Sequence, residues 1–246
     1  MYAIRQRSGR YPGLPVRPFG SWALTFGGVD EFVDLTGTQV GPDVAWSIAI
    51  WVRVPATAVA VGLWAEHSAG TGRRYLEVQA DGTFFYAVLA NDGSTAIALT
   101  AATSGRDDGN WHHVVVTERG DRLVTLYVDG VRDAVTPANY DGTAVTVTAA
   151  SLGRRPGGGG AFSNFLTGDI AHLATWSREL SNTDAASLYN NGISWDWRLL
   201  GSGGPVHNYQ CGEDDTFPSL TDRGSGPAVT GTMTNMESAD IARGGP

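Results

Sequence analysis

Large apolar residues alternate with small or polar ones through most of the chain from residue 21 onward. The clearest case is SIAIWVRV at 47–54, and Trp22, Leu24 and Phe26 are spaced in the same way. A period of two is that of a β-strand with one face in a core. The pattern predicts strands at 22–26, 47–54, 76–79, 83–88, 96–100, 111–117, 123–128, 131–135, 145–152 and 168–177. Many short strands divided by turn residues predict an all-β fold, a two-sheet antiparallel sandwich.

Two Asp-Gly pairs lie between predicted strands, at Asp81-Gly82 and Asp129-Gly130. Both residue types tolerate the positive φ of a tight two-residue hairpin turn. Each pair therefore predicts a hairpin between its flanking strands.

One segment has the start and stop signals of a helix. Ser181 is followed three residues later by Asp184, the spacing of a capping box. Asn190-Asn191-Gly192 supplies residues that adopt the left-handed conformation at a helix end. We therefore expect one short helix of about two turns over 182–189.

The two ends of the chain lack the strand pattern. Residues 1–20 contain three prolines and three glycines without a period, which predicts an extended N-terminal arm. Residues 198–246 are rich in Gly, Pro, Asp, Thr and Ser. We expect a C-terminal extension with little regular structure that needs a partner surface. The predicted division is an arm at 1–20, a sandwich at 21–197 and an extension at 198–246.

The net charge of −8 argues against nucleic acid as a partner. The arm nevertheless carries Arg5, Arg7, Arg10 and Arg17 and no acid. One interpretation is that the arm, with its Tyr11, contacts an acidic surface of a neighbouring copy, which would make the protein a homo-oligomer; the alternative is a floppy terminus. The candidate acceptor is the acidic cluster Glu213, Asp214 and Asp215; a solvated loop and a cation site are the alternatives.

Cys211 is the single cysteine, so no disulfide within the chain is expected. The first 20 residues contain no apolar run of signal-peptide length, and no segment is apolar over ~18 residues. We therefore expect neither secretion by the usual route nor a membrane partner.

Six phrases occur in an order typical of one family. They are LTFGGVDEFVDL (24–35), WSIAIWVRVP (46–55), NWHHVVVT (110–117), LVTLYVDG (123–130), SLGRR (151–155) and GDIAHLATWSRELSNTDAASLYNNG (168–192). Together they resemble the laminin-G-like branch of the concanavalin A-like lectin/glucanase superfamily. The resemblance implies a concanavalin A-like jelly roll. The tail after Pro205 resembles, more weakly, tails of structural proteins of tailed bacteriophages.

The resemblance also implies a structural Ca²⁺, which oxygen ligands suit. Gly27 and Ala171 stand where the family usually has aspartate, so two acids are missing. Asp30 and Asp169 remain as candidate ligands. The alternative is that both are ordinary acids of a turn and a strand end, with no cofactor at all.

No catalytic constellation is recognisable. No strand carries carboxylates in the E-x-D-x-x-E spacing of glycoside hydrolases on this fold. His112 and His113 are strand neighbours that point to opposite faces, so they cannot chelate one ion. Gly157–Gly160 lacks the Lys-Ser/Thr of a phosphate-binding loop. We expect a protein that is not an enzyme.

Eight tryptophans raise the question of sugar binding, because aromatic rings stack on pyranose faces. Trp64 and His67, near Glu66, are the candidate glycan-binding residues. Packing in a core or an interface is the alternative for the tryptophans.

Two functions remain. The first is a virion structural protein made in the host cytoplasm, which decorates or cements a phage capsid or belongs to a tail. Its terminal segments would contact neighbouring subunits and the major capsid or tail proteins. The alternative is a lectin-like module that binds host or surface glycan.

Overall fold

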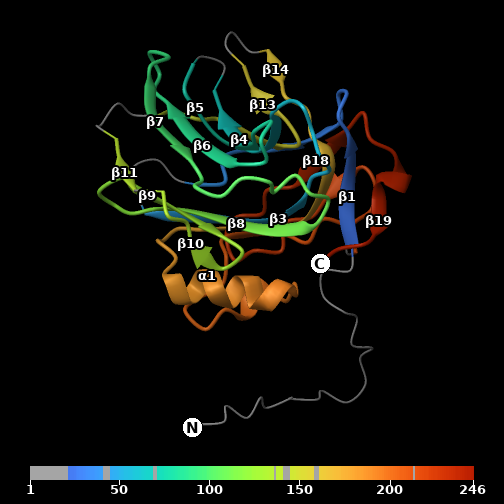
Figure 1. Ribbon diagram of the computed structural model, residues 1–246. Helices are drawn as coiled ribbons and strands as arrows, with labels where there is room; N and C mark the ends of the chain where they lie inside the picture. Colours follow the sequence, from blue (N-terminus) through green and yellow to red (C-terminus); the bar gives the residue numbers. More distant parts are fainter. Residues whose placement is uncertain are drawn as a thin grey trace.

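The chain folds as two large antiparallel sheets that face each other, as Figure 1 shows in the computed structural model. The structure describes residues 22–40, 45–68, 71–135, 137–140, 145–157, 161–212 and 214–246. The predicted all-β jelly-roll sandwich with one short helix is confirmed.

The first sheet, sheet A, has the strand order β10-β9-β8-β3-β15-β1-β19, and β11 and β16 pair with β9 and β15. Its strands are β1 (Trp22–Gly27), β3 (Trp46–Arg53), β8 (Trp111–Glu118), β9 (Leu123–Val128), β10 (Val131–Arg132), β11 (Ala138–Asn139), β15 (Thr167–Trp176), β16 (His207–Tyr209) and β19 (Ile241–Arg243).

The second sheet, sheet B, has the order β17-β18-β2-β12-β4-β5-β6-β7. Its strands are β2 (Phe32–Leu35), β4 (Val61–His67), β5 (Arg73–Val78), β6 (Phe84–Leu89), β7 (Thr95–Thr100), β12 (Ala149–Leu152), β17 (Ser219–Leu220) and β18 (Gly231–Thr234). A small hairpin of β13 (Arg155–Pro156) and β14 (Phe162–Ser163) lies on the far side of sheet B in Figure 1.

The main core fills the space between the sheets. Strand β3 illustrates how large and small apolar residues alternate between the two faces of a sheet. Ile48, Ile50 and Val52 of β3 belong to this core. Ala49 and Trp51 point to the other face of sheet A and are equally buried. Both faces are apolar here because a second layer covers the outer face of sheet A.

That second layer is α1 (Asn182–Tyr189) with the short helices η2 (Asn190–Gly192) and η3 (Trp197–Leu199). The predicted capping box is confirmed: Ser181 Oγ accepts from Asp184 N, and the Asp184 carboxylate accepts from Ser181 N. Asn190 ends the helix at φ 45°. A further short helix, η4 (Ser238–Asp240), precedes β19.

Both predicted hairpins form, but one has a longer loop than expected. Asp129 and Gly130 have φ of 49° and 76°, as a two-residue turn requires. At Asp81-Gly82 the chain closes with Gln79 N donating to Thr83 O, which makes the loop three residues long. Only Gly82 has positive φ there, at 74°.

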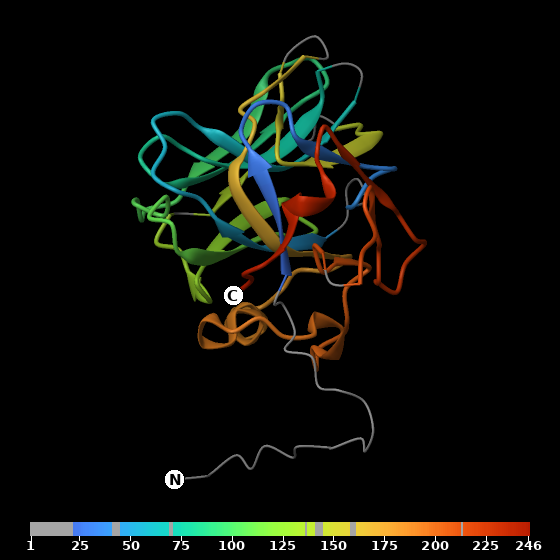
Figure 2. The same cartoon turned by 90° about the vertical axis from the view of Figure 1, so that its right-hand side faces the viewer.

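The segment 198–246 differs most from its prediction. Its strands are only two to four residues long, but they pair into the sandwich: β16 with β15, β18 with β2, and β19 with β1. Tyr209, Leu220 and Met233 are buried in the main core. The segment is therefore built into the body of the fold, as Figure 2 shows in red along β1.

Within the part of the chain that the structure describes, no helix is long and apolar enough to cross a membrane.

Candidate functional site

The outer face of sheet B, away from the main core, carries a separate, small apolar cluster of buried residues. Ala65, Tyr75, Ala87 and Leu89 form the cluster, and the half-buried Phe85 packs against it. These residues alternate along β4, β5 and β6 with core residues such as Phe84 and Tyr86, which point inward.

A hollow of about 400 Å³ lies on this face beside Phe85. Its lining consists of Gln79, Ala80, Asp81, Thr83, Phe85 and Thr100. The β5–β6 loop supplies the polar residues on one side. Thr100 of β7 lies directly across from Phe85 in the register of the sheet.

Hydrogen bonds hold the polar rim in place. Asp81 Oδ1 accepts from Thr83 N at 3.0 Å and from Thr83 Oγ1 at 2.7 Å. These two bonds, from the Thr83 side chain and backbone, lower the pKa of Asp81 and keep it ionised. Gln79 Nε2 donates to Glu77 Oε1 at 2.5 Å, which leaves the side-chain oxygen of Gln79, Oε1, as an acceptor. The hollow thus brings the half-buried Phe85 ring together with hydrogen-bonding groups.

The β13–β14 hairpin covers the other end of the same face. The Arg154 guanidinium lies between the Phe32 and Phe162 rings, 3.5 Å from each centroid, and pairs with Asp34. Arg155 bonds the buried Glu77 carboxylate at 3.3 Å. The hollow beside Phe85 is therefore the open part of this face.

The predicted glycan residues Trp64 and His67 do not form one site. Trp64 is fully buried between the sheets, 6.2 Å from Trp46, so the expectation of an exposed ring is wrong. A register shift between Gly62 and Trp64 turns this tryptophan into the core. His67 does lie on the outer face of sheet B, but its ring packs edge-on against Phe162 at 5.1 Å.

The candidate Ca²⁺ ligands Asp30 and Asp169 do not make a metal site. Asp169 accepts from Thr25 Oγ1 at 2.8 Å and from Arg53 Nε at 2.9 Å, so a cation already neutralises it. Asp30 accepts from Asn235 Nδ2 at 3.0 Å on an exposed loop. Among the described residues, no three His, Cys, Asp or Glu side chains come together to hold a metal. The residues present do not fit a Ca²⁺ ion.

The acidic cluster is divided. Asp215 accepts from Gly212 N, Thr221 N and the Arg223 guanidinium, and its side chain is inaccessible to solvent. It organises the local turn, so the expectation that it forms a surface contact is wrong. Asp214 is exposed. Glu213 lies outside the described residues, as do Arg5, Arg7, Arg10, Tyr11 and Arg17 of the arm.

His112 and His113 point to opposite faces, as predicted. His112 bridges Asp108 and Asp129 at 3.1 and 3.0 Å. His113 is buried under α1, 5.0 Å from the Trp51 ring.

Two carboxylates in the core are paired rather than exposed to substrate. Glu66 Oε1 accepts from Gln39 N and Val40 N, and Arg74 lies 3.5 Å from its other oxygen. Glu118 accepts from Tyr140 Oη at 2.9 Å. Both glutamates are buried, so neither can meet a glycosidic bond at the surface.

Two facing antiparallel sheets define the class of two-sheet β-sandwiches. The chain belongs to the Laminin G 3 family of the concanavalin A-like lectin/glucanases superfamily, whose model matches residues 26–186. No curated protein matches the sequence.

Solved structures share the fold at low sequence identity. A Bacteroides ovatus protein, whose carbohydrate binding is itself only a proposal, has a TM-score of 0.64 at 12% identity, covering 91% of this chain and 60% of that one. The CBM40 of a Ruminococcus gnavus IT-sialidase, bound to alpha2,3 sialyllactose, has 0.55 at 13%, covering 70% and 99%. A heptameric SAP-like pentraxin from Limulus polyphemus has 0.53 at 14%, covering 89% and 97%. At such identities the likeness shows the fold alone.

Sequence reasoning missed the Phe85 hollow, although the signal was present. Residues 83–88 were predicted as a strand, and two adjacent phenylalanines in a strand must point to opposite faces. One of Phe84 and Phe85 therefore had to lie outside the core.

Proposed function

We propose that the protein is a non-catalytic carbohydrate-binding module whose ligand lies in the hollow on the outer face of sheet B. The observation that carries the proposal is the half-buried Phe85 ring, with Gln79, Asp81 and Thr100 around it. A pyranose has an apolar face of C–H groups and a rim of hydroxyls, and such a hollow suits both parts.

The polar rim matches the needs of a sugar. Hydroxyl groups both donate and accept hydrogen bonds. Asp81 and the Gln79 carbonyl can accept from them, and the Thr100 hydroxyl can do either. The carbohydrate-binding neighbours support the proposal through the fold.

A glycan array probed with the full chain tests the proposal, with and without a chelator. We expect binding to a subset of glycans that the chelator does not change. Flat responses across the array would overturn the proposal.

Phe85→Ala then tests where the glycan binds. We expect about tenfold weaker binding to the best glycan, equivalent to ~1.4 kcal/mol. Phe217→Ala is the matched control, because Phe217 is 37% exposed and lies outside the hollow. Equal loss in both variants would count against the hollow.

One of the two extensions that favoured the virion role is part of the sandwich. The segment 198–246, expected to reach over neighbours, packs into the sandwich instead. The arm at 1–20 lies outside the described residues. Virion localisation, homo-oligomerisation and capsid or tail partners therefore stay predictions. A mass-spectrometric census of purified particles tests them, since absence of the chain from particles would exclude the role.

A further inference from the structure

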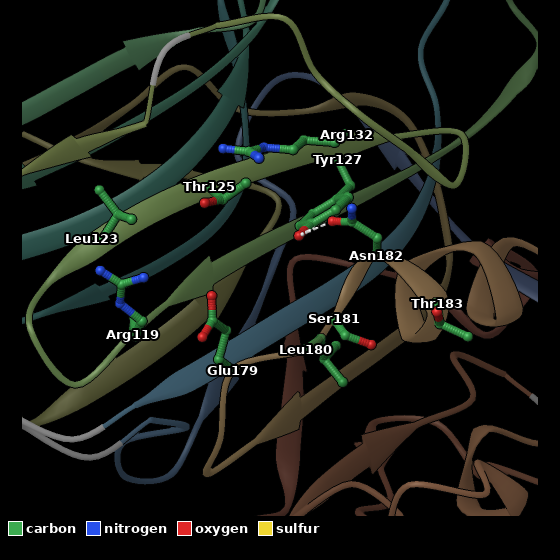
Figure 3. A pocket seen from close by; sticks show the side chains of 10 residues that line it. All are labelled: Arg119, Leu123, Thr125, Tyr127, Arg132, Glu179, Leu180, Ser181, Asn182 and Thr183. Carbon is green, nitrogen blue, oxygen red and sulfur yellow. Dashed lines mark hydrogen bonds between the residues drawn. The ribbon is translucent and has the colours of Figure 1, made fainter.

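A second hollow, of about 440 Å³, lies on the outer side of sheet A, between β9 and the start of α1 (Figure 3). We call it the α1–β9 groove. Its lining residues are Arg119, Leu123, Thr125, Tyr127, Arg132, Glu179, Leu180, Ser181, Asn182 and Thr183.

The floor of the groove offers no ring face. Leu123, Thr125 and Tyr127 alternate along β9 and point to the outer side of sheet A. Tyr127 is only 4% exposed, and its hydroxyl donates to Asn182 Oδ1 at 2.9 Å. A ligand here would be held by hydrogen bonds from the walls rather than by stacking.

The walls carry two charged side chains of opposite sign that are not paired with each other. Arg132 of β10 and Glu179 of the segment before α1 are exposed. Glu179 interacts electrostatically with Arg119, but within the described parts of the chain neither the Arg132 nor the Glu179 side chain forms a hydrogen bond or a close ion pair. Arg119, by contrast, is held by Asp121, with Nε donating to Oδ1 at 2.8 Å.

The charges restrict what can bind. An arginine only donates hydrogen bonds and a glutamate only accepts them. An anion would face the Glu179 carboxylate, and a cation would face Arg132 and Arg119. A neutral ligand with several hydroxyls can accept from Arg132 and donate to Glu179 without meeting a like charge, and a saccharide carries such hydroxyls.

We propose that the α1–β9 groove is a second binding site, which takes a neutral saccharide through hydroxyls that accept from Arg132 and donate to Glu179. This site is independent of the Phe85 hollow, since the two lie on outer faces of different sheets. One chain could then hold two glycan segments on opposite sides, which raises avidity for a multivalent glycan.

The test is NMR shift mapping on the full chain with three neutral methyl hexosides (gluco, galacto and manno). Methyl glucuronide serves as the charged counterpart of the glucoside. We expect a neutral hexoside to shift amides at 119–132 and 179–183, and the glucuronide to do so more weakly. No shifts there with any neutral hexoside would overturn the proposal, as would stronger binding of the glucuronide.

Three variants separate the two sites. Arg132→Met should weaken groove binding by about tenfold, as loss of a hydrogen bond from a charged group does. Glu179→Gln should bring glucuronide binding up toward that of the glucoside. Phe85→Ala should leave the groove shifts unchanged. Groove shifts lost in Phe85→Ala but kept in Arg132→Met would overturn the second site without touching the first.

Val131→Ala is the control for folding, because Val131 is 68% exposed beside Arg132 and does not line the groove. It should bind the hexosides as the unaltered chain does. Failure of the glycan array with intact groove shifts would overturn the function proposed for the Phe85 hollow and leave the groove standing.

Discussion

His113 and His172 lie in the layer beneath α1 and carry no charge at neutral pH. His172 stacks on Trp197 at 3.7 Å, and its Nε2 lies 2.7 Å from Asn208 Oδ1. Burial lowers the pKa of His113 to about 3 and that of His172 to about 4. An unfolded histidine titrates near pH ~6.5, so the unfolded chain binds protons first as the pH falls.

We therefore expect the free energy of unfolding to fall as the pH is lowered from about 6.5 toward 5. Urea titrations at several pH values measure this slope. Burial raises the pKa values of Glu66 and Glu118, and these groups and His112 contribute to the slope in the opposite sense, so the part due to His113 is read from the difference between the variant and the unaltered chain. His113→Met should reduce it. A slope that is unchanged in the variant would contradict the assignment.

His112 titrates in the opposite sense. Burial alone would lower its pKa, but the hydrogen bonds and charges of Asp129 and Asp108 raise it overall. Its contribution to stability is full below the unfolded pKa and is lost as the pH rises through the folded value. His112→Gln should therefore cost more stability at pH 5.5 than at pH 8, as thermal unfolding at both pH values would show.

Arg74 is a buried cation inside the sandwich. It is 1% exposed, lies 3.5 Å from Glu66 and packs over the Trp46 ring at 5.5 Å. Arg74→Met leaves Glu66 as a buried charge without its partner, which costs about 3–5 kcal/mol. Urea unfolding should show this loss.

The double variant Glu66→Gln, Arg74→Met removes both charges and should recover much of the stability. If the double variant is as unstable as the sum of the two single variants, the two side chains do not act as a pair.

For single residues, strand alternation correctly predicted that His112 and His113 point to opposite faces of their sheet. The same rule was not applied to Trp64 and His67. Residues three apart in a regular strand point to opposite faces, so those two could not form one platform. The ion pairs of Asp169 and Asp215 could not be predicted, because their partners, Arg53 and Arg223, are brought to them by the fold.

The helix α1 depends on its capping box. Ser181→Ala removes the acceptor for Asp184 N and should cost about 1 kcal/mol. Ser187→Ala is the matched control, since Ser187 Oγ bonds Thr183 O within the helix and caps nothing. Thermal unfolding of both variants measures the difference, and equal losses would contradict the cap.

Element length explains most of what the sequence could reveal, with one exception: β4 has seven residues and was not predicted, because the register shift between Gly62 and Trp64 breaks its alternation. β9 was predicted at its observed bounds, 123–128, and β3, β8 and β15 within about one residue, because each is long enough to show a period. β16 to β19 have two to four residues each. These strands are too short to show a period in the sequence. They are held in place by pairing with strands far away in the chain, and a local sequence pattern cannot report such pairing.

At the scale of the whole molecule, residues 198–246 are part of the sandwich. The segment covers β1 at one edge of sheet A and extends sheet B beyond β2. A chain ending at Trp197 loses these strands and exposes the edges of both sheets. We expect it to aggregate or to unfold without cooperativity.

Circular dichroism melts of the truncated chain test this prediction. Deletion of residues 1–20 is the comparison, and it should leave a cooperative transition. A cooperative transition in the chain that ends at Trp197 would restore the separate extension that the composition suggested.

Pairing of β1 with β19 sets Trp22 opposite Arg243, so the chain enters and leaves the sandwich at the same place (Figure 2). A domain with adjacent ends can be inserted into a loop of another protein or be permuted without stretching its host. Such a domain is joined to its host at a single place on its surface. A tether fused there would start at the β1–β19 edge of sheet A, whereas the α1–β9 groove lies toward the opposite, β10–β9 edge of that sheet.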